Sequence, residues 1–205
     1  MSREPSPARE AGRFNKQTSD RAEGLGDIYL APFMVGWKKG DLKYDVRLGF
    51  YAPTGEYDKN DLANVGKNYW TAEPAASMSY LGSKNGIEVT TFAGIDFNSE
   101  NQDTDYQTGD QAHIDLTVAQ HLPLGKGIAG VGANGFYYRQ ITGDSSDTSR
   151  LGDFKARTAG IGPVLSYATK VSGHDLVIEV KWLPELDVEN RLEGDYVWVK
   201  AALLF

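Results

Sequence analysis

The chain has 205 residues, no cysteine and a formal net charge of −7 at neutral pH. The lack of cysteine excludes disulfides, cysteine nucleophiles and zinc–cysteine sites, and the acidic balance argues against a nucleic-acid partner, because modules that bind phosphate backbones carry a basic face. A mean hydropathy of −0.43 excludes a bundle of transmembrane helices, but it does not exclude a membrane barrel, whose strands hide apolar residues in alternation.

The chain begins with a polar, charged stretch over residues 1–23 that contains no apolar signal core. We interpret this stretch as a leader or loop remnant and residues 24–205 as a single β-domain. Period-two alternation in that domain predicts nine strands. They span about 26–37, 42–52, 69–81, 87–97, 111–121, 128–140, 154–168, 175–183 and 195–205.

The predicted connections alternate in length. Short turns are expected at 38–41, 82–86, 122–127 and 169–174, and long polar loops at 53–68, 98–110, 141–153 and 184–194. Outer-membrane barrels have short periplasmic turns and long extracellular loops. The sequence therefore predicts an all-β fold, an antiparallel up-and-down transmembrane β-barrel with its C-terminus on the periplasmic side.

Charged residues share one face of several predicted strands. Lys43, Asp45 and Arg47 alternate with apolar residues, so one face would meet lipid and the other a lumen. A soluble sandwich gives the same alternation, and periodicity alone leaves both folds open. The strand at 154–168 fits less well, because Pro163 cannot donate to a ladder and Arg157 shares the parity of apolar residues; a bulge near Gly160 or Gly162 would return the charge to the lumen.

Three features favour the membrane fold. Small residues are frequent in the predicted strands, aromatic residues such as Trp37, Tyr51, Tyr138 and Trp182 lie near strand ends as in interfacial girdles, and the last strand ends on Phe205.

The polar face predicts the lining of a solute path. Its candidate residues are Lys43, Asp45, Arg47, Glu73, Glu88, Asp96, His113, Asp115, Glu179, Lys181 and Lys200. These groups would select solutes by charge and hydrogen bonding, as pores do. The alternative is that the charges satisfy one another and fill a narrow barrel.

Metal binding and catalysis find little support in the sequence. Asp103, Asp105 and Asp110 could gather oxygens around Ca²⁺, but they lack the order of an EF-hand, and we predict no metal site and no cofactor. His113 and His121 lie on one strand, roughly 26 Å apart by strand rise, so they cannot form one site. Asp105 with His113 remains an acid–base possibility, but we do not expect an enzyme.

Five stretches carry a family resemblance. They are GLGDIYLAPF (24–33), GFYAPTGEYD (49–58), LANVGKNYWTAEP (62–74), GIDFNSENQDTDYQTGDQAHID (94–115) and WLPELDVENRLEGDYVW (182–198). They resemble the outer-membrane transporter-like family named for the MetA pathway of phenol degradation. The motif residues that fall in its extracellular loops are Asn64, Lys67, Asn68, Asn98, Glu100, Asp105, Asn190, Arg191 and Glu193. Such loop residues are expected to hold the loops or line their mouth.

The resemblance implies an outer-membrane β-barrel that admits small organic molecules, aromatic or hydrophobic ones among them, and it brings no catalytic residues. The expected partners are outer-membrane lipid and lipopolysaccharide, the barrel-assembly machinery through the C-terminal strand, and a small organic solute. A structural or adhesive barrel, or a soluble ligand-binding barrel without transport, is the alternative.

The resemblance also bears on strand number. Members of this type begin with a signal peptide and roughly three further strands, and bacterial single-chain barrels have even strand numbers. We therefore expect a start further upstream and closure at about twelve strands.

Overall fold

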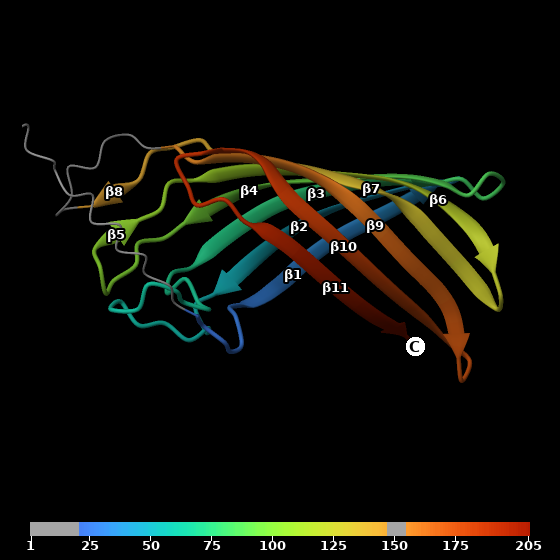
Figure 1. The fold of residues 1–205 in the computed structure, drawn as a ribbon, viewed down its shortest axis with the longest axis horizontal. Coiled ribbons are helices and arrows are strands. Elements are labelled where there is room, and N and C mark those ends of the chain that lie inside the picture. The colour runs from blue at the N-terminus through green and yellow to red at the C-terminus, as the bar shows by residue number, and fades with distance from the viewer. Residues whose placement is uncertain (1–20, 147–154) are drawn as a thin grey trace, which may run out of the picture.

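The computed structural model describes residues 21–146 and 155–205, and within these ranges the protein is all-β. Nine long strands form one sheet in chain order (Figure 1). They are β1 (Ile28–Lys39), β2 (Leu42–Ala52), β3 (Thr71–Leu81), β4 (Ile87–Asn98), β6 (Gln111–Leu124), β7 (Gly127–Gln140), β9 (Arg157–Val171), β10 (His174–Glu189) and β11 (Asp195–Leu204). In the loops, β5 (Tyr106–Gln107) pairs with β8 (Ser145–Ser146).

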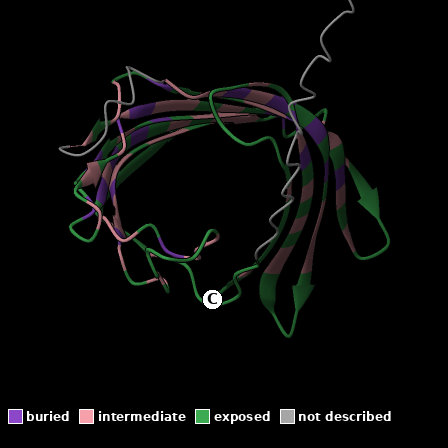
Figure 2. Ribbon diagram, turned by 60° about the vertical axis from the view of Figure 1, so that its left-hand side comes forward, coloured by how far each residue is buried: buried purple, intermediate pink, exposed green. Residues whose placement is uncertain are grey.

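Every neighbouring pair in the large sheet is antiparallel, which confirms the predicted up-and-down order of nine strands. The sheet is strongly curled, with β1 and β11 at its two edges (Figures 1 and 2). In the described ranges no helix is long and apolar enough to cross a bilayer. Most of the predicted leader, residues 1–20, lies outside the described residues.

The connections follow the predicted rhythm except at the last loop. The turns at 40–41, 125–126 and 172–173 contain two residues each, and both Ser172 and Gly173 have positive φ, as a type I′ hairpin requires. The predicted long loop at 184–194 is wrong: β10 continues to Glu189, and only residues 190–194 connect it to β11.

The register between β7 and β9 is regular at Gly160 and Gly162, where a bulge would have turned Arg157 inward. The irregularity lies in the partner strand β10, between Glu185 and Asp187. Pro163 lies inside β9 and pairs with Ala133 of β7. Arg157 keeps the outward parity and meets Glu189 Oε2 at 3.1 Å and Asp187 Oδ2 at 3.5 Å, so the charge is satisfied by neighbouring carboxylates without turning inward.

Burial in this sheet is the reverse of that in a water-soluble protein. The buried apolar side chains in the described ranges are Ala52, Ala75, Ala119, Val164 and Leu183. The buried polar side chains are Thr71, Glu73, Asn98, Asn101, Gln111, Thr117, Asn134, Gln140, Thr158 and Glu185. Large apolar residues such as Leu116, Val131 and Leu165 are about half exposed instead. A soluble fold hides its large apolar residues from solvent.

Candidate functional site

The strand register places all eleven predicted path residues on one face of the sheet. Directly paired residues on neighbouring strands point the same way. One such row runs Asp45, Ser77, Phe92, Asp115, Phe136, Gly160 and Glu185. Parallel rows hold Lys43, Arg47, Glu73, Glu88, Asp96, His113, Glu179, Lys181 and Lys200. Residues of β4 and β11 line one cavity together, so this face is the concave one.

The part of this wall formed by β2, β3, β4 and β6, which we call the charged half, holds charges in contact with one another. Arg47 donates two hydrogen bonds to Asp45 Oδ1, at 2.8 and 2.5 Å, and the Ser77 hydroxyl donates to the other oxygen of this carboxylate. The Arg47 guanidinium also lies 5.2 Å from the Phe92 ring centre. These charges are therefore satisfied within the wall.

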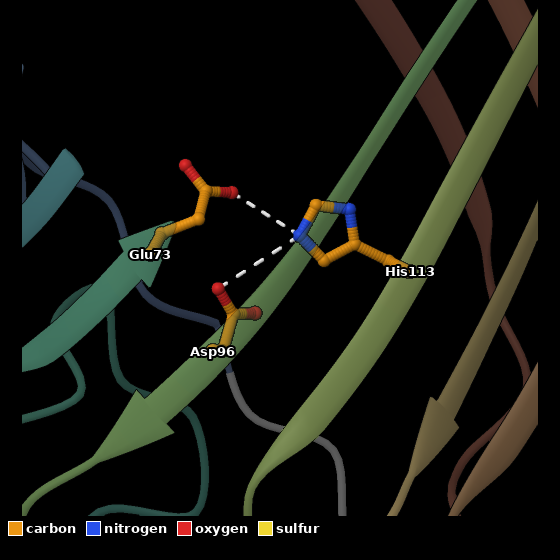
Figure 3. A group of neighbouring side chains, drawn as sticks. All are labelled: Glu73, Asp96 and His113. Carbon is orange, nitrogen blue, oxygen red and sulfur yellow. Dashed lines mark ion pairs between the residues drawn. The ribbon is translucent and has the colours of Figure 1, made fainter. Parts of the chain in front are cut away.

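His113 joins two carboxylates on the same half (Figure 3). Its Nε2 lies 3.1 Å from Glu73 Oε1 and 3.8 Å from Asp96 Oδ1. The three residues come from β3, β4 and β6. Gly94 pairs directly with His113, and a Cβ on Gly94 would overlap the imidazole, so the missing side chain is what lets the ring reach across β4.

His121 forms a separate group further along β6. Its Nε2 lies 2.6 Å from Glu88 Oε2, and Thr90 donates a hydrogen bond to the other oxygen of Glu88 at 2.8 Å. The two histidines thus have different carboxylate partners.

Rings on this face lie flat over glycines of the neighbouring strand. Tyr29 covers Gly49, and Phe136 covers Gly160; a Cβ on either glycine would overlap the ring. His121 lies over Gly130 in the same way. Such pairing of an aromatic residue with a cross-strand glycine keeps bulky rings against the sheet.

The remaining part of the wall, formed by β7, β9, β10 and β11, is the aromatic half. Phe136, Tyr138, Tyr196 and Trp198 line a cavity of roughly 230 Å³. Arg191 also lines it and lies 5.5 Å from the Tyr138 ring centre. None of these four rings was predicted as a path residue from the sequence, although the register places them on the same face as the predicted path charges.

A second cavity of roughly 430 Å³ adjoins the first. Trp198 lines both, and Lys181, Lys200 and Glu179 contribute charges to the second. The aromatic half therefore offers ring surfaces beside cations.

Two of the expected girdle residues belong to the concave face. Tyr51 pairs with Thr71 and Tyr138 with Thr158, both of which are buried on that side. Trp37 and Trp182 point outward and are 52% and 50% exposed. The aromatic residues near strand ends thus divide between the two faces.

The predicted loop motif residues mostly hold loop backbone in place. Asn98 accepts a hydrogen bond from Thr71 Oγ1 at 2.7 Å and donates to the Gly109 carbonyl at 3.0 Å. Asn68 donates to Asp103 Oδ2 at 2.9 Å, and Asn64 accepts from the Asp58 amide at 2.8 Å.

Other members of that motif lie at the rim. Lys67 Nζ lies 5.5 Å from the Tyr51 ring centre, Asn190 donates to the Lys155 carbonyl, and Arg191 donates to the Tyr196 hydroxyl at 2.7 Å. Arg191 also lies 3.3 Å from Glu185, whose side chain is fully buried. The remaining three motif residues, Glu100, Asp105 and Glu193, are exposed, as are Lys67, Asn190 and Arg191.

Asp144 holds together the loop around β5 and β8. This residue was not among those predicted from the sequence motifs. It accepts hydrogen bonds from the Tyr106 hydroxyl, from the Gly109 amide at 2.9 Å and from Gln140 Nε2 at 2.5 Å. Burial raises the pKa of the Tyr106 phenol, and the bond to Asp144 raises it further.

Comparison with known proteins gives one relation. No curated protein and no solved structure matches the chain. The sequence model of the family described as "Putative MetA-pathway of phenol degradation" matches residues 7–201. This match covers nearly the whole chain and starts earlier than the resemblance seen from residue 24. The chain therefore belongs to this family, as its motifs predicted.

Proposed function

We propose that the protein is an outer-membrane β-barrel that admits small organic solutes, aromatic ones included, along its concave face. The observation that carries the proposal is the reversed burial. Side chains such as Leu116, Val131 and Val197 are exposed on the convex face, while Glu73, Thr117 and Asn134 are buried. An extended apolar exterior is stable in lipid and favours aggregation in water. This contrast supports a lipid environment over the soluble alternative.

The concave face has the chemistry that such solutes need. Rings of Phe136, Tyr138 and Trp198 provide stacking surfaces, and Arg191 and Lys200 stand beside them. A planar acid could contact a ring and a cation together. We therefore place the solute path along the aromatic half of the wall.

The partners follow from the same proposal. Lipid and lipopolysaccharide would surround the convex face, and the barrel-assembly machinery would engage the last strand, β11. No chemical step is proposed, because His113 faces Glu73 and Asp96 on the wall, so the Asp105–His113 acid–base pair considered from the sequence gains no support.

Cell fractionation and vesicle swelling test this function. We expect recovery in the outer membrane, a heat-modifiable gel mobility, and swelling of protein-containing liposomes in benzoate that exceeds swelling of empty liposomes. Recovery of the full-length protein as a monodisperse, detergent-free species in buffer would refute the membrane assignment. Membrane recovery without swelling would support the structural barrel instead.

A further inference from the structure

We propose that Glu73, Asp96 and His113 form a binding site for one divalent transition-metal ion of the zinc type. One imidazole and two carboxylates are a donor set that zinc accepts in proteins. The candidate ligand atoms all lie within 4.8 Å of one another. They come from three adjacent strands and converge on a point above the wall (Figure 3).

The distances suit a bound ion after a small adjustment. Zinc holds nitrogen and oxygen ligands at about 2.0–2.2 Å, so neighbouring ligand atoms in a tetrahedral site lie about 3.3 Å apart. His113 Nε2 and Glu73 Oε1 are 3.1 Å apart, and His113 Nε2 and Asp96 Oδ1 are 3.8 Å apart. The Glu73 and Asp96 oxygens lie within 4.8 Å of each other, so the two carboxylates have to draw closer together around an ion.

A second observation points to a ligand at this place. Asp96 Oδ1 is shielded from solvent and has no hydrogen-bond partner in the described part of the chain, yet it faces the His113 ring. Glu73 beside it is only 3% exposed. Asp96 is largely shielded as well, with its side chain 13% exposed. Carboxylates in such surroundings are costly unless a cation or hydrogen bonds compensate their charge, and a metal ion at this point would do so.

The ligands are held on strands, which makes the site more rigid than one built on loops. Gly94 leaves room for the His113 ring, and Phe92 lies beside that ring with 5.5 Å between their centres. His113 also lines the cavity of the aromatic half. An ion would reach the imidazole through this cavity.

Cobalt titration of the folded full-length protein in detergent tests the site. Chelator-treated protein would be titrated with CoCl₂ at neutral pH while visible d–d absorption is recorded, and ZnCl₂ would then be added. We expect one Co²⁺ per chain, displaced by one equivalent of Zn²⁺. The variants His113→Gln and Asp96→Asn should weaken binding at least about 100-fold, since even residues behind the ligands cost 10–100-fold.

The matched control is His121→Gln, which removes a histidine from the same strand and face whose described partner is the single carboxylate Glu88. This variant should bind Co²⁺ like the wild type. Heat-modifiable mobility shows that each variant is folded, and Asp96→Asn keeps the shape of the side chain if His113→Gln does not fold.

A wild-type protein without a stoichiometric cobalt band would overturn the proposal, and so would equal losses in His121→Gln and Asp96→Asn. In either case the three side chains would form only a contact between strands within the wall. The measurement needs no solute flux, so its outcome is independent of the proposed transport function.

Discussion

The charged half and the aromatic half of the concave wall use their inward side chains differently. In the charged half, Arg47 is hydrogen-bonded to Asp45, and His121 to Glu88, so these side chains are paired with one another within the wall. In the aromatic half, Tyr196 and Trp198 border cavities. One face of a sheet can therefore hold the strands together on one side and leave surface for a solute on the other.

This difference reconciles the two interpretations of the polar face that the sequence left open. Arg47 and Asp45 on β2 satisfy one another, whereas Lys200 on β11 lines the larger cavity. Lys181 shows both features, because it lies 3.5 Å from Glu179 and also lines the larger cavity. The comparison predicts that substitutions in the charged half change stability and that substitutions in the aromatic half change permeation.

The largest stability loss is expected for Arg47→Ala. It leaves Asp45, whose side chain is 20% exposed, without its cation, and this should cost on the order of 2 kcal/mol. The unfolding midpoint in urea, followed by gel mobility, measures the loss. Lys170→Ala is the control, because its pair with Asp175 is well exposed and should contribute less than about 1 kcal/mol. Unchanged stability with altered benzoate flux in Arg47→Ala would reverse the assignment of this half.

A smaller loss is expected for Gly94→Ala. The added methyl group would overlap the His113 ring and force it away from Glu73, at a cost of about 1–2 kcal/mol. Gly135→Ala is the matched control within β7, since a Cβ there meets its neighbours only at ordinary contact distances of 3.7 and 3.9 Å. The same urea titration compares the two. Equal midpoints would show that the ring does not depend on the glycine.

Much of the wall could be predicted because alternation is a local property of the sequence. It placed Lys43, Arg47 and Glu179 on one face, and the structure puts them there. The same alternation places Trp198 on the face of Lys200, but the predicted path contained only charged residues and one histidine, and Tyr138 was assigned to a membrane girdle. Tyr51 shows that an aromatic residue near a strand end can face either way.

The contacts between strands could not be predicted, because they depend on register. His113 reaches Glu73, forty positions earlier in the chain, only because β3, β4 and β6 are aligned so that Gly94 lies between them. The extension of β10 past Pro184 could not be predicted from the sequence for a related reason. Pro184 lies just before the bulge between Glu185 and Asp187, where the ladder is irregular, so this proline did not end the strand.

In the aromatic half, Trp198→Ala should reduce permeation more than stability. The side chain is 61% exposed and borders both cavities, so its removal should cost less than about 1 kcal/mol while benzoate-driven swelling slows several-fold. Val197→Ala is the control, because this neighbour has the opposite parity on β11, is 68% exposed and lines neither cavity. Slower swelling in Val197→Ala alone would place the path elsewhere.

The smallest effect is expected outside both halves, in the loop that Asp144 holds. Tyr106→Phe removes one hydrogen bond to Asp144 and should loosen the loop by about 0.5–1 kcal/mol, measured as faster proteolysis. Because the folded protein raises the pKa of Tyr106 above its ordinary value of about 10, this stabilisation is complete below that pH and falls as the pH rises toward the folded pKa. The difference in proteolysis rate between the wild type and Tyr106→Phe should therefore be constant around neutral pH and become smaller above about pH 10. Tyr57→Phe, in another loop, should leave the proteolysis rate unchanged at every pH. A gap that widens with rising pH would mean that the phenol is bound as its anion, and Asp144 could then not be its acceptor.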